Sequence, residues 1–164
     1  MWLKQLSDWV YTVEKGLVII LVATMFFSLS AGVIFRYYLN DPLLWSDELA
    51  IFALIWLTFL GGSMSIKRQQ SAAVTLFTDR LQGRLKWLVI SIGFAIITLF
   101  CLYLLYICYH WLASPNIAIQ RSSSMRLPMI YVYLSVPVGF AFMMIHALAL
   151  FKDSLKREQA DDES

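Results

Sequence analysis

The sequence predicts an all-α integral membrane protein with four transmembrane helices plus interfacial amphipathic helices. The first observation is composition: 60% of the 164 residues are hydrophobic and 15% are charged, whereas soluble domains are about half apolar and about a quarter charged. The second is a series of four apolar segments, each near the roughly 20 helical residues that a bilayer crossing needs. The third is the placing of tryptophans at segment ends, as in the aromatic belts of membrane proteins.

The N-terminal segment, residues 2–14, is predicted to form an interfacial amphipathic helix. Its apolar residues recur at helical spacing with polar residues between them, so Trp2 and Trp9 would lie at headgroup depth. An N-terminal extension of the first span is the alternative. Because Asp8 and Glu14 interrupt this segment and no small-residue cleavage site follows the apolar run, we do not expect a signal peptide.

The remaining chain divides into spans and polar connections. Between the second and third spans, residues 72–86 place apolar side chains on one helical face, which predicts an amphipathic connector in the interface. The charged segment 152–164 is expected to be a cytoplasmic tail, which leaves one four-helix membrane domain over residues 1–151. The predicted spans are residues 16–37, 43–64, 87–111 and 127–151.

Charged residues gather at the turn between the first and second spans. Arg36 ends the first apolar run, and the adjacent carboxylates Asp47 and Glu48 lie in the first two turns of the second. A charge near membrane depth is costly unless it is paired or hydrated, so these three residues are functional candidates. Asp41 and Pro42 predict the start of the second helix, because aspartate accepts free N–H groups and proline at the first position loses no hydrogen bond.

Two roles are open for this charged cluster. Arg36 could pair with Asp47, with Glu48 or with a partner residue, and so hold two spans as a fixed hairpin or contact another subunit. Alternatively, these groups could carry an ion or a proton. A proton path would need ionisable groups through the membrane centre, but the middles of the first three spans have none, and His146 lies toward the cytoplasmic end of the fourth. We therefore favour a structural ion pair or partner contact.

Small residues predict where helices approach closely. In the first span, Ser28 and Gly32 are four residues apart, which places two small side chains on one helical face. Gly61 and Gly62 lie near the end of the second span, where glycine marks close packing or the exit of the helix. We expect the side exposing these four residues to pack closely on another helix.

Tryptophans and prolines mark the ends and the bends of the spans. Pro137 in the middle of the fourth span removes a backbone hydrogen bond, which predicts a kink there, and Pro128 lies near the start of that span. Tryptophans at span ends are predicted to anchor the protein at the membrane interface. These anchors are Trp2, Trp9, Trp45, Trp87 and Trp111.

The basic residues predict the orientation. With the N-terminus in the cytoplasm, 10 of the 13 lysines and arginines fall on the cytoplasmic side, and three, Arg36, Arg121 and Arg126, fall on the other. The positive-inside rule therefore places both termini in the cytoplasm and the charged turn outside. The ten are Lys4, Lys15, Lys67, Arg68, Arg80, Arg84, Lys86, Lys152, Lys156 and Arg157.

No catalytic, metal or cofactor site is expected. Cys101 and Cys108 are seven residues apart in one apolar run, about 10 Å along a helix and beyond disulfide reach. His110 and His146 lie near opposite ends of their spans, so they cannot be the two axial ligands of one haem, and polar packing or an interfacial position is expected for each. The net charge of +2 is too small to indicate nucleic-acid binding.

The residues around the charged turn resemble the small membrane subunit of the tripartite ATP-independent periplasmic (TRAP) transporters. The resemblance covers roughly residues 10–150, and the order and spacing of its motifs make it specific. One departure is the segment Gln70-Ser71-Ala72-Ala73, where the family often has a histidine after the basic pair, so no role of that histidine transfers here. The matching residues are Phe35-Arg36-Tyr37, Pro42, Trp45, Asp47-Glu48-Leu49, Trp56, Phe59-Leu60-Gly61-Gly62, Leu127-Pro128, Tyr133 and Pro137-Val138-Gly139.

The resemblance implies a partnership rather than catalysis. In this family the small subunit binds a large multi-spanning permease, which holds the substrate and sodium sites and moves as an elevator, and a periplasmic binding protein delivers the substrate. The resemblance implies a scaffold in the bacterial inner membrane that contacts lipid and helps to dock the binding protein. It implies an organic-acid substrate, either sialic acid or a C4-dicarboxylate. The alternative is a self-contained four-helix oligomeric transporter or channel, against which the position of Asp47 and Glu48 near one membrane face counts.

Overall fold

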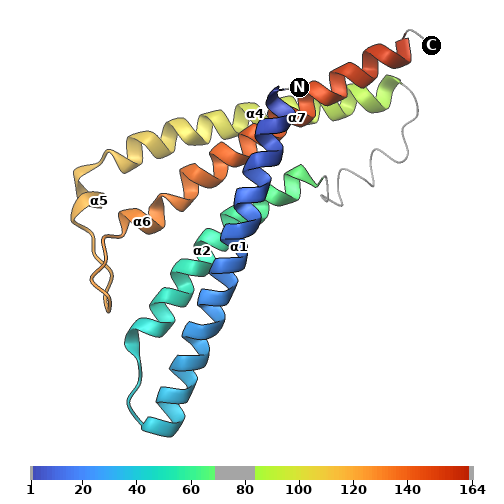
Figure 1. Ribbon diagram of the computed structural model, residues 1–164. Coiled ribbons are helices and arrows are strands. Elements are labelled where there is room, and N and C mark those ends of the chain that lie inside the picture. The colour runs from blue at the N-terminus through green and yellow to red at the C-terminus, as the bar shows by residue number, and fades with distance from the viewer. Residues whose placement is uncertain (1, 69–83, 163–164) are drawn as a thin grey trace.

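The computed structural model describes residues 2–68 and 84–162. Four helical segments are long and apolar enough to cross a membrane: Trp2–Leu39, Leu44–Lys67, Leu88–Leu112 and Ile130–Asp153. The predicted fold class, an all-α multi-pass membrane protein, is therefore confirmed. The elements in chain order (Figure 1) are α1 (Trp2–Ile34), η1 (Phe35–Leu39), α2 (Leu44–Lys67), α4 (Arg84–Leu112), α5 (Pro115–Ile119), α6 (Ile130–Tyr133) and α7 (Ser135–Asp162).

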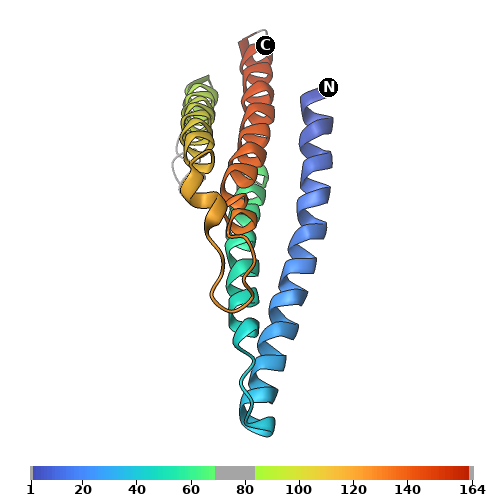
Figure 2. The same ribbon diagram turned by 90° about the vertical axis from the view of Figure 1, so that its left-hand side faces the viewer.

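The long helices form two pairs, and α7 of one pair contacts both helices of the other. α1 packs on α2, α4 packs on α7, and α7 also contacts α2 and α1. α1 crosses α7 near the termini, and the α1–α2 pair and the α4–α7 pair then run in different directions (Figure 1). Both termini lie at the same end, and the turn after α1 lies at the opposite end (Figure 2). We call these the terminus end and the loop end.

Most of the buried side chains between the helices are small, chiefly alanine and serine. Ala53, Leu60 and Ala147 are at most 3% exposed, whereas large residues such as Phe26 and Phe27 are 64% and 69% exposed. Lipid tails are as apolar as these side chains, so a membrane helix gains little by burying them and associates through close packing and polar contacts instead. The fold therefore has little apolar core of its own and a large apolar surface.

Residues 2–14 are continuous with the first span and do not form a separate helix. α1 runs without a break from Trp2 to Ile34, which is the extension that the sequence left as the alternative. Ser7 and Glu14 are fully buried and face other helices, and these contacts hold the segment in line with the span. Trp2 and Trp9 are 88% and 65% exposed; their position at headgroup depth stays a prediction.

The turn between α1 and α2 differs from the one predicted. α2 begins at Leu44, with Leu43 as its N-cap and without a side-chain cap, so the expected cap by Asp41 is wrong. The backbone N–H of Asn40 donates to the carbonyl of Phe35 and closes the π-helical turn η1, and the amide of Asp41 donates to the same carbonyl at 3.2 Å. Pro42 disfavours a helical conformation in the residue before it, which keeps Asp41 out of the helix.

The fourth span is interrupted one turn before Pro137. Leu134 separates α6 from α7, and Pro137 is the third residue of α7, where the N–H that proline lacks would have no partner within the helix. The hydroxyl of Ser135 donates to the carbonyl of Val132 at 2.6 Å and so satisfies a carbonyl at the break. Pro128 lies outside the span, in a β-bridge with Arg121.

Two predicted segments are described only in part. Most of the amphipathic connector, residues 72–86, lies outside the described residues, as does the side chain of Trp87. The charged tail begins as a continuation of α7, which extends to Asp162. Its side chains beyond residue 153 are outside the description.

Candidate functional site

The predicted small residues of α1 lie against the start of α2. The hydroxyl of Ser28 donates to the carbonyl of Ser46 at 2.8 Å. A Cβ atom built on Gly32 would lie 2.5 Å from the hydroxyl oxygen of Ser46, closer than real Cβ contacts come. Only glycine allows this approach, so the loop end of the α1–α2 pair depends on Gly32.

The two adjacent glycines of α2 differ in their surroundings. A Cβ on Gly62 would lie 2.8 Å from the terminal methyl carbon of Met143 on α7, whereas a Cβ on Gly61 would meet no described atom within 4 Å. Gly61 points about 100° away from Gly62 around the helix, toward a side where no described atom would meet a Cβ. Gly139 of α7 makes a third close contact, which was not predicted. A Cβ atom built on Gly139 would lie 2.6 Å from Cβ of Phe59.

The predicted interface tryptophans Trp45 and Trp111 are both partly exposed, at 41% and 46%. Trp45 lines an apolar hollow of about 340 Å³ between α1 and α2, together with Phe27 and Leu49. Trp111 meets the ring of Tyr133 edge to face, with ring centres 4.8 Å apart. Their depth in the membrane stays a prediction.

Arg36 pairs with Asp47. Its Nη2 donates to Oδ2 of Asp47 at 3.0 Å, and the two side chains are 53% and 57% exposed. The pair joins the π-helical turn after α1 to the first turn of α2. Exposed ion pairs contribute about 0–1 kcal/mol, so this contact fixes the direction of the turn more than it stabilises the fold.

Glu48 has a different partner. Its carboxylate accepts hydrogen bonds from three consecutive backbone amides: Ser123 to Oε1 at 3.0 Å, Ser124 to Oε2 at 3.1 Å and Met125 to Oε2 at 2.8 Å. These amides belong to the connection between α5 and α6, some 75 residues further along the chain. Two adjacent carboxylates of α2 therefore hold two different segments at the loop end.

The connection that Glu48 holds is a tight hairpin, residues 120–129. The amide of Ser122 donates to the carbonyl of Leu127 at 2.9 Å, and the amide of Leu127 donates back to Oγ of Ser122 at 3.1 Å. Arg126 has a positive φ of 52°, which lets the chain reverse within these few residues. This geometry leaves the amides of residues 123–125 free to face Glu48. We call this segment the loop-end hairpin.

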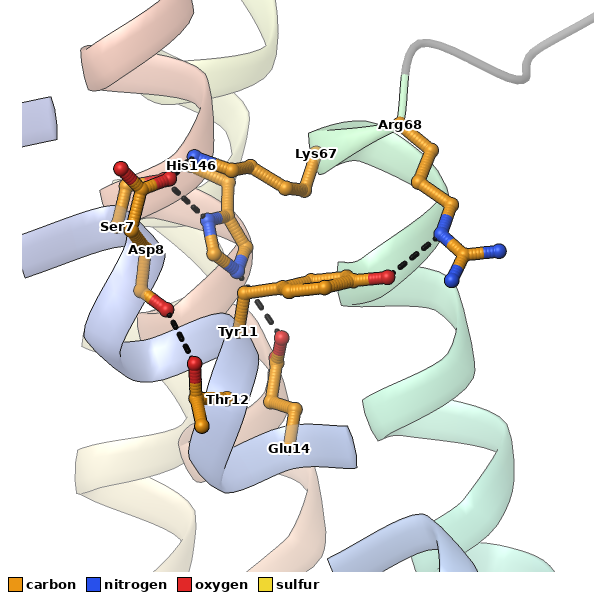
Figure 3. A network of polar contacts seen from close by, with 8 residues as sticks. All are labelled: Ser7, Asp8, Tyr11, Thr12, Glu14, Lys67, Arg68 and His146. Atoms are coloured by element: carbon orange, nitrogen blue, oxygen red, sulfur yellow. Dashed lines mark hydrogen bonds and ion pairs between the residues drawn. The ribbon is translucent and has the colours of Figure 1, made fainter. Parts of the chain in front are cut away.

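The terminus end holds a buried polar network that the sequence did not predict (Figure 3). Oγ of Ser7 lies 2.7 Å from Nδ1 of His146, and Nε2 of His146 lies 3.0 Å from Oε2 of Glu14. The ammonium group of Lys67 donates to Oγ of Ser7 at 2.6 Å. Ser7, Glu14 and His146 are all 0% exposed. The network joins α1, α2 and α7.

A more exposed layer surrounds the buried network. Lys67 also forms an ion pair with Asp8 at 2.8 Å. Nε of Arg68 donates to the hydroxyl of Tyr11 at 2.7 Å, and the hydroxyl of Thr12 donates to the backbone carbonyl of Asp8 at 2.9 Å (Figure 3). Lys67 and Arg68 thus connect the C-terminal end of α2 to the first turns of α1.

The proton positions in the network follow from what each group can donate. An ammonium group only donates, so the oxygen of Ser7 accepts from Lys67 and its own hydrogen is available for Nδ1 of His146. Nε2–H of His146 then donates to Glu14. This arrangement gives the hydroxyl of Ser7 and the ring N–H of His146 one acceptor each and assigns the Nε2–H tautomer to His146. All hydrogen bonds therefore run in one direction, from Lys67 toward Glu14.

This network acts as a clamp rather than as a catalytic site. Its order of groups resembles a serine–histidine–carboxylate arrangement, but Ser7 is 0% exposed, so a substrate could not reach its oxygen. Oε1 of Glu14 and Oγ of Ser63 are buried and have no hydrogen-bond partner among the described residues. In the part of the chain that the structure describes, no three His, Cys, Asp or Glu side chains could hold a metal ion together.

Sequence reasoning found His146 as a polar packing residue but missed its partners. The helical pattern predicts that Glu14 ends an interfacial helix, and it gives Ser7 no role. A usable signal was present: Ser7, Val10 and Glu14 are spaced i, i+3 and i+7 and share one helical face. A carboxylate on the same face as apolar residues indicates a buried polar contact.

Comparisons with known proteins agree with this architecture. A family model described as "Tripartite ATP-independent periplasmic transporters, DctQ component" matches residues 16–157. The chain is 28% identical over 147 residues to the sialic acid TRAP transporter small permease protein SiaQ of Vibrio cholerae, covering 89% of this chain and 83% of that protein.

Two further relatives carry related names. The isethionate TRAP transporter permease protein DctMQ of Oleidesulfovibrio alaskensis is 27% identical over 145 residues, which are 82% of this chain and 22% of that protein. The C4-dicarboxylate TRAP transporter small permease protein DctQ of Vibrio cholerae is 27% identical over 104 residues, 63% of this chain and 45% of that protein. The chain belongs to the DctQ component family of the tripartite ATP-independent periplasmic transporters, a family of transport proteins and not of enzymes.

Proposed function

We propose that this chain is the non-catalytic small permease subunit of a sodium-coupled TRAP transporter that imports an organic acid. It would form the fixed scaffold beside a large elevator-type permease subunit and would help to dock a periplasmic substrate-binding protein. Family membership supports the subunit role. The DctMQ relative, of which this chain matches only 22%, supports a much larger permease partner.

One observation carries the scaffold role: the charged side chains at both ends of α2 are engaged in contacts between segments. Asp47 and Glu48 hold the turn and the loop-end hairpin, and Lys67 holds α1. Between them, the 18 residues from Leu49 to Ile66 carry no formal charge. A carrier would need polar or ionisable groups along such a path, so α2 fits a structural element better than a transport route.

The loop end is the proposed docking surface for the binding protein. Tyr37 and Tyr38 are 74% and 86% exposed, and Arg121 and Arg126 of the loop-end hairpin are also exposed. With the termini in the cytoplasm, as the positive-inside rule predicts, this surface would face the periplasm across the bacterial inner membrane. Exposed tyrosine and arginine side chains are enriched at protein interfaces.

The substrate is proposed to be an anionic organic acid. The relatives are named for sialic acid, isethionate and C4-dicarboxylates, which are all anions near neutral pH. Sialic acid and C4-dicarboxylates are the two candidates for this chain. The small subunit itself would not select between them, because the substrate site is proposed to lie in the large subunit.

Co-purification tests the proposal directly. The chain would be isolated from its native membrane in a mild detergent, and the co-purifying proteins would be identified by mass spectrometry. A large multi-spanning permease in stoichiometric amount is expected. Reconstituted with its binding protein, the pair should take up an organic acid only when a sodium gradient is applied.

The competing function is a self-contained four-helix transporter or channel. Recovery of the chain alone, as a homo-oligomer that moves solutes in liposomes, would establish that function and refute the scaffold role. In that case, Asp47→Asn and Glu48→Gln should reduce transport in liposomes of the chain alone. In the proposed complex, the same variants should change assembly or docking and leave the sodium-to-substrate ratio unchanged.

A further inference from the structure

We propose that the loop-end hairpin, residues 120–129, is a carboxylate-binding site and that Glu48 is its resident ligand. The position of the hairpin tip on α2 would then depend on a carboxylate and not on packing alone. This inference concerns the chain itself and does not depend on the proposed transport function.

The first argument is the geometry of the donors. Three successive backbone amides, those of Ser123, Ser124 and Met125, all point at one carboxylate at distances of 2.8–3.1 Å. Successive N–H groups in a turn form a concave site for anions. Both oxygens of Glu48 are used, one by Ser123 and the other by its two neighbours, so the site fits the two oxygens of a carboxylate.

The second argument is that the hairpin builds this site with its own hydrogen bonds. The reciprocal contacts between Ser122 and Leu127 close the hairpin, and the amide of Met129 donates to the carbonyl of Gln120 at 3.0 Å. Arg126 supplies the positive φ that reverses the chain. The hydroxyl of Ser122 also hydrogen-bonds to the carboxylate of Glu48, but the backbone contacts of the hairpin do not involve Glu48, so the hairpin should keep the site when Glu48 is replaced.

The third argument is charge. Arg121 and Arg126 both lie in the hairpin, and Nη1 of Arg121 donates to the carbonyl of Arg126 at 3.4 Å. Two positive charges in the same hairpin as the three amide donors favour an anion over water. Without one, the amide of Met125, which is half-buried, would lose its partner, and unpaired amides away from bulk water are costly.

The fourth argument concerns what Glu48 holds in place. The base of the hairpin is anchored elsewhere: the indole N–H of Trp56 donates to the carbonyl of Tyr131 at 3.2 Å, and the hydroxyl of Tyr133 donates to Oε1 of Gln120 at 2.8 Å. Residues 123–125 at the tip are held to α2 by Glu48. Replacing Glu48 should therefore release the tip and leave the base in place.

Amide hydrogen exchange of the full-length protein in detergent or nanodiscs tests this inference. Glu48→Ala should accelerate exchange at residues 123–125 by about tenfold or more, because exchange reports local opening. Asp47→Ala is the matched control, since it removes the adjacent carboxylate, and it should leave these amides unchanged. Sodium acetate should restore protection in Glu48→Ala in a saturable manner.

Rescue by acetate separates a carboxylate site from a merely structural contact. Sodium chloride at equal ionic strength and acetamide, which has a similar shape but no charge, should not restore protection. The inference would be overturned if sodium chloride or acetamide restored protection as well as acetate does. Unchanged amide exchange in Glu48→Ala would also overturn it. If Glu48→Ala does not fold, Glu48→Gln is measured instead. Its neutral amide should give exchange rates at residues 123–125 between those of the unmodified protein and those of fully released amides. Rates equal to those of the unmodified protein would overturn the inference.

Discussion

The polar contacts at the two ends of α2 show how burial changes the free energy that such a contact contributes to stability. At the loop end, Arg36 and Asp47 lie 3.0 Å apart and are more than half exposed; at the terminus end, His146 and Glu14 also lie 3.0 Å apart and are fully buried. Water and salt screen the first pair, whereas the second has no solvent to replace a lost partner. Losing a contact should therefore lower the free energy of unfolding only slightly at the loop end and strongly at the terminus end.

The largest effect is expected for Glu14→Ala. This change leaves Nε2–H of the fully buried His146 without the carboxylate that accepts its hydrogen bond, and an unpaired buried donor whose lost partner is charged costs about 3 kcal/mol. The measurement is the Tm of the purified protein in detergent. If Glu14→Ala lowered the Tm no more than Asp47→Ala does, the contrast between the buried and the exposed end of α2 would be wrong.

A double-mutant cycle sharpens this first prediction. Glu14→Ala, His146→Ala and the double variant would be compared under identical conditions. Because the two side chains contact each other directly, the double variant should cost clearly less than the sum of the two single changes. Additive losses would mean that each side chain acts through other neighbours.

Gly139→Ala should give the second largest effect, in the packing between the two ends. Its Cβ position lies 2.6 Å from Cβ of Phe59, so α2 and α7 would have to separate, at about 1–3 kcal/mol. Gly61→Ala is the control, because its Cβ position is free of described atoms and alanine favours a helix. Equal losses of Tm for both variants would show that backbone conformation, and not close approach, explains the glycine.

Trp56→Phe should have a smaller effect. The change removes the hydrogen bond from the indole to the carbonyl of Tyr131 and keeps an aromatic ring, so a loss of about 1 kcal/mol is expected. Faster amide exchange around residues 130–134, with unchanged exchange near His146, would locate the effect at the base of the loop-end hairpin. A change at both places would mean that the two ends are coupled.

Asp47→Ala should have the smallest effect on stability, below about 1 kcal/mol. Added salt should reduce the difference between this variant and the unmodified protein, because the exposed pair is screened. The same salt series should not reduce the loss caused by Glu14→Ala. A salt-independent loss at Asp47 would indicate that its contact with Arg36 is better shielded than its exposure suggests.

The sequence predicted the parts of this molecule that depend on local pattern. The four spans follow from the length of apolar segments, and their observed bounds differ from the predicted ones by a few residues, except at Trp2, where α1 extends the first span. The candidates Arg36, Asp47 and Glu48 could be selected because charges near a membrane are rare. Gly32 and Gly62 could be selected because small residues allow helices to approach.

The partners of these residues could not be predicted, because they lie far away in the chain. Glu48 binds amides 75 to 77 residues away, and backbone amides leave no mark in a sequence. Glu14 and His146 are 132 residues apart. The Asp41–Pro42 signal for a helix start was overridden because Asp41 stays with the preceding turn, where its amide donates to the carbonyl of Phe35, and α2 begins only at Leu44. Local chemistry was visible in the sequence, and the pairing of distant segments was not.

The crossing of α1 and α7 near the termini has a mechanical consequence. α1 has 33 residues and is about 50 Å long, and the Ser7–Glu14–His146 network grips it close to one end. α1 is thus a lever whose fulcrum is the buried network. A rotation of one degree at that network displaces the far end of α1, about 36 Å away, by roughly 0.6 Å. A small shift among these three buried side chains would therefore move the loop end, where we propose that the binding protein docks.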